Sequence, residues 1–157
     1  MKKVRSRTLF FILIGLVSVS FSAYAHSKPA FEYFHPEISK GKAESLLDRV
    51  KEIEKMDFEN VHFEDLAANP LSSHHLVVIR KKEPLHYHAV HDGWAIVLKG
   101  QADFFLGETQ LRLRPGTSVY IPRGVRHQAV NSGKDPLAAF VIFTPPYDGK
   151  DLVRVEE

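Results

Sequence analysis

One stretch of the chain does most to decide its fold: GTSVYIPRGVRHQAVN, residues Gly116–Asn131. It begins with a glycine typical of a turn, continues through the short apolar run SVYIP, and turns again at Pro122-Arg123-Gly124. Another strand begins near His127 and reaches Asn131, whose amide is expected to bond backbone groups at the next turn. Short strands joined by tight turns are typical of an antiparallel sheet. His127, at the beginning of a strand, is the first candidate functional residue.

Segments of the same kind lie on both sides of this stretch. After Asp57 the chain consists of short runs that are rich in β-branched and aromatic residues and are separated by Gly, Pro, Asn and Asp. These runs are LSSHHLVVIRK, WAIVLKG, QADFFLG, TQLRLRPG, SVYIP, HQAVNSG and LAAFVIFTPP. Because the strands are closely spaced and no helix intervenes, the sequence predicts an all-β domain, an antiparallel sandwich or barrel.

A single amphipathic helix is predicted before the strands, between Pro36 and Met56. Ser39 is a candidate for its N-terminal cap. Its apolar positions follow the three-and-four spacing of a helix: Leu46, Leu47, Val50 and Ile53. We expect this helix to pack on the outside of the domain, with its mixed charges facing solvent.

The first 25 residues have the composition of a secretory leader. Four cations and no acid precede the apolar run Leu9 to Phe21, and Ala23 and Ala25 supply the small residues of a cleavage site. The run is shorter than the ~20 residues that a membrane-spanning helix needs. We therefore expect a signal peptide at 1–25, an extended and helical segment at 26–60 and a barrel domain at 61–157. The product would be periplasmic or secreted, without stable membrane insertion after cleavage; an uncleaved anchor is the alternative.

The charge balance and the cysteine count narrow the classes of function. The leader holds four of the 21 Lys and Arg and none of the 19 Asp and Glu, so the remainder would carry 17 cations, 19 acids and a formal charge of −2. A basic, nucleic-acid-binding surface therefore has no support. Because the chain has no cysteine, its stability must come from a hydrophobic core.

Two further histidines stand upstream in LHYHAVHDGWAIVLKG, from Leu85 to Gly100. His86 and His88 are separated by one residue, so on a strand both imidazoles project from the same face. Such a pair alone is weak support for a metal site, because a half-exposed strand also alternates in this way. The downstream block with His127 strengthens the interpretation.

Together the two blocks resemble the two motifs of the cupin family, which are small antiparallel β-barrels of the jelly-roll kind. The second family pattern, G-x5-P-x-G-x2-H-x3-N, is met at every fixed position by Gly116, Pro122, Gly124, His127 and Asn131. The first, G-x5-H-x-H-x3-4-E-x6-G, is met by His86, His88 and Gly100. The resemblance covers about Leu76 to Phe143. It implies a jelly-roll β-barrel with a divalent metal at His86, His88 and His127.

The first motif departs from the family at the glutamate that would be a fourth ligand. Counted back from Gly100, this position falls at Gly93; counted forward from His88 with the shorter spacing, it falls at Asp92. Asp92 is therefore the preferred fourth ligand, with His91 and a water molecule as alternatives. The leading glycine of the motif is replaced by Arg80.

Three imidazoles, with or without one carboxylate, suit Fe(II), Mn(II), Ni(II), Cu(II) or Zn(II), and the ligand set does not choose among these transition metals. Occupancy is expected to fall as the pH drops through about 6–7, because only neutral imidazole binds a metal. The resemblance implies a metal-dependent enzyme of oxygenase or isomerase type that acts on a small-molecule substrate. The alternative is a non-enzymatic protein that binds a metal or a small ligand. A homodimer formed through sheet edges is a further expectation.

Other residues carry weaker expectations. Arg123 and Arg126, beside His127, are candidates for binding an anionic substrate, although turn arginines are usually solvated. His74 and His75 are interpreted as surface histidines. Four aromatic residues are assigned to barrel packing: Trp94, Phe104, Phe105 and Tyr120. The tail TPPYDGKDLVRVEE is expected to cover one end of the barrel and to take no part in chemistry.

Overall fold

The computed structural model describes residues 32–33 and 43–156, and the predicted leader and Ser39 lie outside the described residues. Its elements are β1 Glu32–Tyr33, β2 Glu44–Ser45, α1 Leu46–Glu54, β3 Val61–Ala68, β4 Ser73–Ile79, β5 His86–His88, β6 Asp92–Lys99, β7 Ala102–Leu106, β8 Thr109–Leu113, β9 Ser118–Ile121, β10 His127–Asn131, β11 Leu137–Thr144 and β12 Leu152–Arg154. Every run that the sequence assigned to a strand contains one. The chain also forms β3, which its more polar sequence did not reveal.

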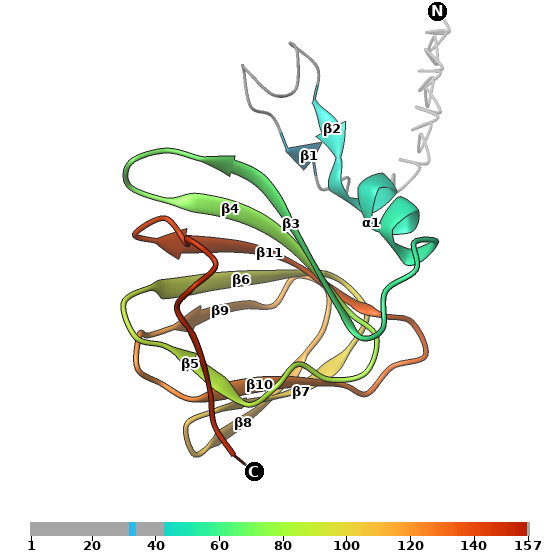
Figure 1. Cartoon of the computed structure of the whole chain (residues 1–157). Coiled ribbons are helices and arrows are strands. Elements are labelled where there is room, and N and C mark those ends of the chain that lie inside the picture. The colour runs from blue at the N-terminus through green and yellow to red at the C-terminus, as the bar shows by residue number, and fades with distance from the viewer. Residues whose placement is uncertain (1–31, 34–42, 157) are drawn as a thin grey trace, which may run out of the picture.

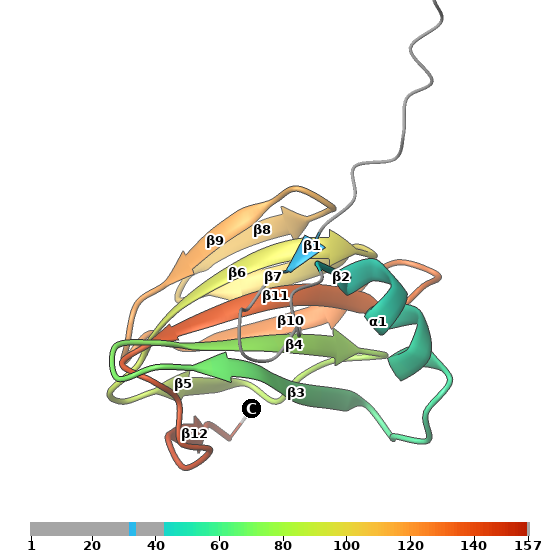
Figure 2. The ribbon, with the colours of Figure 1, turned by 90° about the horizontal axis from the view of Figure 1, so that it is seen from above.

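Two five-stranded antiparallel sheets face each other (Figure 1). One has the order β12-β5-β10-β7-β8 and the other the order β3-β4-β11-β6-β9. Strands distant in the sequence are therefore neighbours, as β5 and β10 are, and this arrangement is the predicted jelly-roll barrel. The C-terminal segment leaves β11 in one sheet and crosses to the other, where β12 pairs with β5 (Figure 2).

The main core lies between the sheets. Its buried members are Ile79, Val97, Ala102, Phe104, Leu113, Val119, Ile121, Ala129 and Leu137. Most of these side chains lie at alternate positions of their strands, because successive residues of a strand point to opposite faces. Burial of these side chains supplies the stability that a chain without disulfides needs.

The helix α1 covers part of the outer face of the β3-β4-β11-β6-β9 sheet, as expected. Its Val50 and Ile53 are fully buried against Leu76, Val78 and Ala138 of that sheet. The N-terminal cap is Ser45, whose hydroxyl oxygen accepts a hydrogen bond from the Asp48 N–H at 3.2 Å. Among the described residues no helix is long and apolar enough to span a membrane.

The turn before His127 ties the two motifs together. Gly124 has φ +76°, a left-handed conformation that glycine adopts without strain, and its N–H donates to the His88 carbonyl at 2.6 Å. Downstream, the Asn131 amide donates to the carbonyls of Arg80 and Asp135 and accepts from the Gly133 N–H. The predicted role of Asn131 at a turn is thus confirmed.

The assignment of four aromatic residues to barrel packing was correct for only one of them. Phe104 is buried in the core, whereas Trp94 and Tyr120 are 49% and 44% exposed and their rings lie 5.3 Å apart on the outer face. Phe105 is 37% exposed. Strand parity explains the difference, since Gly93 and Ala95 face the interior and Trp94, between them, must face outward.

Candidate functional site

Three histidines from two neighbouring strands meet inside the barrel. His86 and His88 are two residues apart on β5, so they share a face of the strand. On β10, His127 lies directly opposite His86 in the antiparallel register. Cross-strand partners point to the same face, so the pairing of these two strands fixes the cluster. All three side chains are buried, with exposed fractions of 4–5%.

The geometry of this group suits a metal ion. One nitrogen from each ring lies within 4.8 Å of the corresponding nitrogens of the other two. The ring centroids of His86 and His127 are 4.2 Å apart, and that of His88 lies 5.1 Å and 5.6 Å from them. Among the described residues this is the cluster of three such side chains that can hold an ion.

Backbone carbonyls orient two of the rings. His86 Nδ1 lies 2.7 Å from the Pro84 carbonyl oxygen, and His127 Nδ1 lies 3.0 Å from that of Val125. A carbonyl only accepts, so both Nδ1 atoms must donate a proton and both Nε2 atoms keep a lone pair. The Nδ1 atom of His88 is buried without a hydrogen-bond partner. The fixed tautomers leave His86 and His127 with the Nε2 lone pairs that a metal site of this type requires.

Burial keeps the three rings neutral. Burial, with the charge of His86, lowers the pKa of His88 to about 4 despite the opposing effect of Asp151. Burial and the charges of His86 and His88 lower the pKa of His127 to about 3, and burial also lowers that of His86. The rings therefore have the protonation state of metal ligands at neutral pH. Protons therefore compete with a metal ion for these nitrogens only at a pH below the range of 6–7 that the sequence suggested.

The histidines border a cavity of about 620 Å³. Its walls are mainly apolar and include Val77, Ile79, Val97, Ala129, Val141 and Phe143. Such a volume accommodates a small molecule, and an apolar wall with a few polar groups is the usual form of a ligand pocket.

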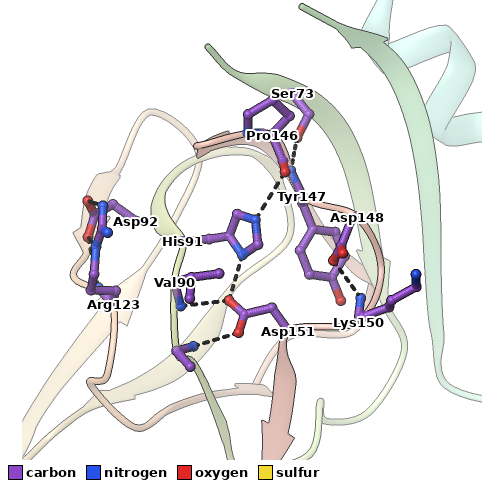
Figure 3. A network of polar contacts seen from close by, with 11 residues as sticks. Ser73, Val90, His91, Asp92, Arg123, Pro146, Tyr147, Asp148, Lys150 and Asp151 are labelled. Carbon is purple, nitrogen blue, oxygen red and sulfur yellow. Dashed lines mark hydrogen bonds and ion pairs between the residues drawn. The ribbon is translucent and has the colours of Figure 1, made fainter. Parts of the chain in front are cut away.

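The structure does not bring Asp92 to the histidines, so the choice of Asp92 as fourth ligand is not supported. Its carboxylate accepts hydrogen bonds from the Arg123 backbone N–H at 2.9 Å and from the guanidinium at 2.7 Å and 3.2 Å. Hydrogen bonds from Arg123 lower the pKa of Asp92 to about 2. In Figure 3 this pair lies to one side of His91, and Asp151 lies to the other. Arg123 is thereby neutralised and is not a free anion-binding group.

Strand parity explains the outward direction of Asp92. The next residue, Gly93, is buried and faces the interior, where a Cβ atom would lie 3.4 Å from Phe143 Cε1 and 3.6 Å from Ile121 Cβ. Phe143 therefore lies where a longer side chain at position 93 would extend, and its ring is 4.8 Å from that of His88. An aromatic ring thus lies in place of the family's carboxylate.

His91, the second alternative for a fourth ligand, holds the C-terminal segment instead. Its Nδ1 lies 2.5 Å from Asp151 Oδ2 and its Nε2 lies 3.0 Å from the Pro146 carbonyl oxygen (Figure 3). Both partners are hydrogen-bond acceptors, so each His91 nitrogen is satisfied only as a donor. Asp151 also accepts from the N–H groups of Ala89 and Val90. This network fastens the segment after β11 to the loop before β6.

His75 is not the surface residue that the sequence suggested. It is 2% exposed, and its Nδ1 lies 2.9 Å from Asp65 Oδ1 and its Nε2 2.6 Å from Ser73 Oγ. The order Asp, His, Ser is that of a hydrolytic triad, but Ser73 is 1% exposed and also accepts from the Tyr147 N–H. A serine closed to substrate in this way is structural, and it anchors the segment at Tyr147 to β4.

Glu83 is the site residue that the sequence analysis missed. It borders the cavity together with the histidines, and its Oε1 accepts a hydrogen bond from the Ala129 N–H at 2.7 Å. Burial raises the pKa of Glu83 to about 7, although this hydrogen bond opposes the change. No motif marks the residue, because it precedes the first histidine by three positions in an irregular segment. A carboxyl group that titrates near neutral pH is suited to proton exchange with a bound ligand.

Replacing Glu83 with glutamine is expected to stabilise the protein at alkaline pH. The folded pKa of about 7 lies above the unfolded value of 4.5, so wild-type stability is lost as the pH rises through this interval. Glutamine stays neutral and still accepts from Ala129. We expect equal free energies of unfolding near pH 5 and an advantage of about 2 kcal/mol for Glu83→Gln at pH 8. Urea unfolding at both pH values measures this, and an equal or less stable variant at pH 8 would contradict it.

Comparison with known proteins places this architecture in a family. A family model described as "Cupin domain" matches residues 75–143, the stretch that carries all three histidines. A protein of Aquifex aeolicus (strain VF5), described as an "Uncharacterized protein", is 36% identical over 113 residues, which are 68% of this chain and 93% of the relative. The xanthan biosynthesis protein XanB of Xanthomonas campestris pv. campestris (strain ATCC 33913) is 41% identical over 74 residues. The match covers 46% of this chain and 15% of XanB.

Solved structures agree with this result. KdgF from Halomonas sp. has 26% sequence identity and a TM-score of 0.53, over 59% of this chain and 86% of that one. The protein TT1209 from Thermus thermophilus has 20% identity and a TM-score of 0.56, over 62% and 95% of the two chains. The second likeness concerns the fold alone. Together with the two motifs and the jelly-roll barrel, these matches establish that the chain belongs to the cupin family.

Proposed function

We propose that this protein is a periplasmic, metal-dependent enzyme of oxygenase or isomerase type that acts on a small molecule. The observation that carries the proposal is the convergence of three neutral, buried imidazoles on one edge of an apolar cavity. His86, His88 and His127 would hold a divalent transition metal. When bound, such an ion polarises a carbonyl or enol group or provides a position for O₂.

Other residues around the cavity would bind the small molecule and exchange a proton with it. The apolar walls exclude water from a bound molecule, which strengthens every electrostatic interaction inside the cavity. Glu83 offers a carboxyl group beside the same space, and it holds or releases its proton near neutral pH. Glu83 is therefore the candidate for proton exchange. Periplasmic location rests on the leader-like composition of residues 1–25.

Elemental analysis and a turnover screen test the proposal. The protein purified from its native compartment should contain about one equivalent of a transition metal, and amino-terminal sequencing should begin at His26. Reconstitution with Fe, Mn, Ni, Cu or Zn, followed by measurement of O₂ uptake and of product formation with candidate small molecules, should reveal turnover with one metal. Tight ligand binding without turnover would instead establish the non-enzymatic alternative. Absence of metal at the three histidines would reject the metal-dependent enzyme.

A further inference from the structure

The tail of the chain places a cation in the wall of the cavity. Arg154 lies on β12, directly opposite His86 in the antiparallel register, and Leu152 lies opposite His88. Because cross-strand partners project from the same face, Arg154 points to the side on which the histidines lie. The lining of the cavity agrees, since it includes Leu152 and Arg154 but not Val153 between them.

The pairing also brings Arg154 close to the histidines. The Val155 N–H donates to the Leu85 carbonyl at 2.9 Å, so Val155 and Leu85 are a hydrogen-bonded pair of the two strands. In an antiparallel ladder such pairs alternate with pairs whose backbone groups do not bond each other, and Arg154 and His86 form one of the latter. The side chains of such pairs approach each other most closely. The positive charge of Arg154 accordingly contributes to the lowered pKa of His86.

The charge of Arg154 is not neutralised by a described residue. Ion pairs of the described part of the chain occupy Arg49, Arg112 and Arg123, but none of them involves Arg154. The three carboxyl groups that border the cavity are engaged elsewhere: Asp65 with His75, Asp148 with the Lys150 N–H and Glu83 with the Ala129 N–H. A cation in this position is suited to an anionic ligand.

The backbone at Arg154 is held firmly, and its exposed side chain borders the cavity. Asp151, which begins the approach to β12, accepts hydrogen bonds from the N–H groups of Ala89 and Val90 and from His91 (Figure 3). Three pairs of residues between β12 and β5 then fix the backbone as far as Arg154. The tail, expected from the sequence only to cover one end of the barrel, therefore presents a charged group in a defined place.

We propose that the cavity binds a small carboxylic acid, with its carboxylate on the Arg154 guanidinium and its apolar body against the cavity walls. One guanidinium matches one carboxylate through two parallel hydrogen bonds. A phosphate monoester is a poorer match, because it carries up to two negative charges and Asp65 and Asp148 also border the cavity. This inference rests on the proposed function in one respect only: the part of the acid beside Arg154 lies next to the metal-binding histidines.

The test compares hexanoate with hexanol, two probes of similar shape that differ in charge, by isothermal titration calorimetry on the full chain at pH 7.5. We expect hexanoate to bind about tenfold or more tightly than hexanol, because a charge-assisted pair is lost with the alcohol. Arg154→Gln should abolish this preference and Arg154→Lys should retain part of it. Arg114→Gln removes an exposed arginine that does not border the cavity and should leave the preference unchanged.

Thermal unfolding of each variant verifies that it folds. Equal binding of both probes to the wild type, no saturable binding of either at millimolar concentration, or an unchanged preference in Arg154→Gln would overturn the inference. Repeating the titrations with and without Zn²⁺ separates it from the proposed function. A preference that depends on Arg154 without metal binding at the histidines refutes the enzyme and keeps the acid site, whereas metal binding without that preference does the reverse.

Discussion

Replacing His127 with alanine is expected to lower the affinity for a divalent metal by about a hundredfold or more. Loss of groups that only orient a ligand already reduces affinity by about 10–100-fold, and His127 supplies one of three ligand nitrogens. The two rings left on β5 cannot enclose an ion by themselves. Metal content per chain, measured by elemental analysis after equilibration with limiting Zn²⁺, should fall accordingly.

Asp92→Ala is the matched control for this experiment. It removes the carboxylate that motif counting selected as fourth ligand, but in the structure that group pairs with Arg123 outside the cluster. Metal content should therefore stay at the wild-type level. If His127→Ala retained full stoichiometry, or if Asp92→Ala lost metal as severely, the three-histidine assignment would be wrong.

The metal-free protein is expected to lose stability steeply between pH 6.5 and pH 4. In the unfolded chain the histidines titrate near 6.5, whereas in the fold His88 and His127 titrate near 4 and 3. Between these values the unfolded state binds more protons, so stability falls as the pH falls. The loss from these two rings is on the order of 5 kcal/mol. Glu83 takes up its proton over the same range and offsets about 2 kcal/mol, so we expect a net loss of about 3 kcal/mol.

Denaturant unfolding of the metal-free protein across this range measures the effect. The variant with His86, His88 and His127 all replaced by glutamine keeps Glu83 but has none of these imidazoles, so its stability should not fall over the same interval. The comparison is made at equal ionic strength to hold surface charge effects constant. A parallel decline in both proteins would show that other groups govern acid unfolding.

The local parts of the structure were predictable from the sequence. The glycines and proline in the block from Gly116 to Asn131 predicted its turns. The positions of His86 and His88, two residues apart on one strand, predicted that both side chains point to the same face. Because β-strand pairing in this fold places the two blocks side by side, their resemblance to the cupin motifs was enough to assemble the three-histidine group. The apolar stripe of α1 likewise predicted which residues it buries.

The predictions that failed depend on contacts between distant segments. Asp92 follows His88 at the spacing that the motif gives to the family's glutamate ligand. The chain turns between β5 and β6, however, so this spacing does not determine the direction in which the Asp92 side chain points. His75 is buried because β3 brings Asp65 beside it, and the polar sequence of β3 did not reveal a strand. The pKa of Glu83 is raised by burial beside Ala129 in β10, and no local sequence pattern indicates this burial.

Two separate parts of the chain line the cavity, and each of them can be varied by substitution independently of the other. The imidazoles come from β5 and β10, whereas Tyr147, Leu152 and Arg154 come from the terminal segment that His91 and Asp151 fasten in place. Substitutions at those terminal positions alter the chemistry presented to a bound molecule without replacing any of the three histidines. We therefore expect ligand selectivity and metal binding to be separable, and a library that varies only positions 147, 152 and 154 tests this expectation.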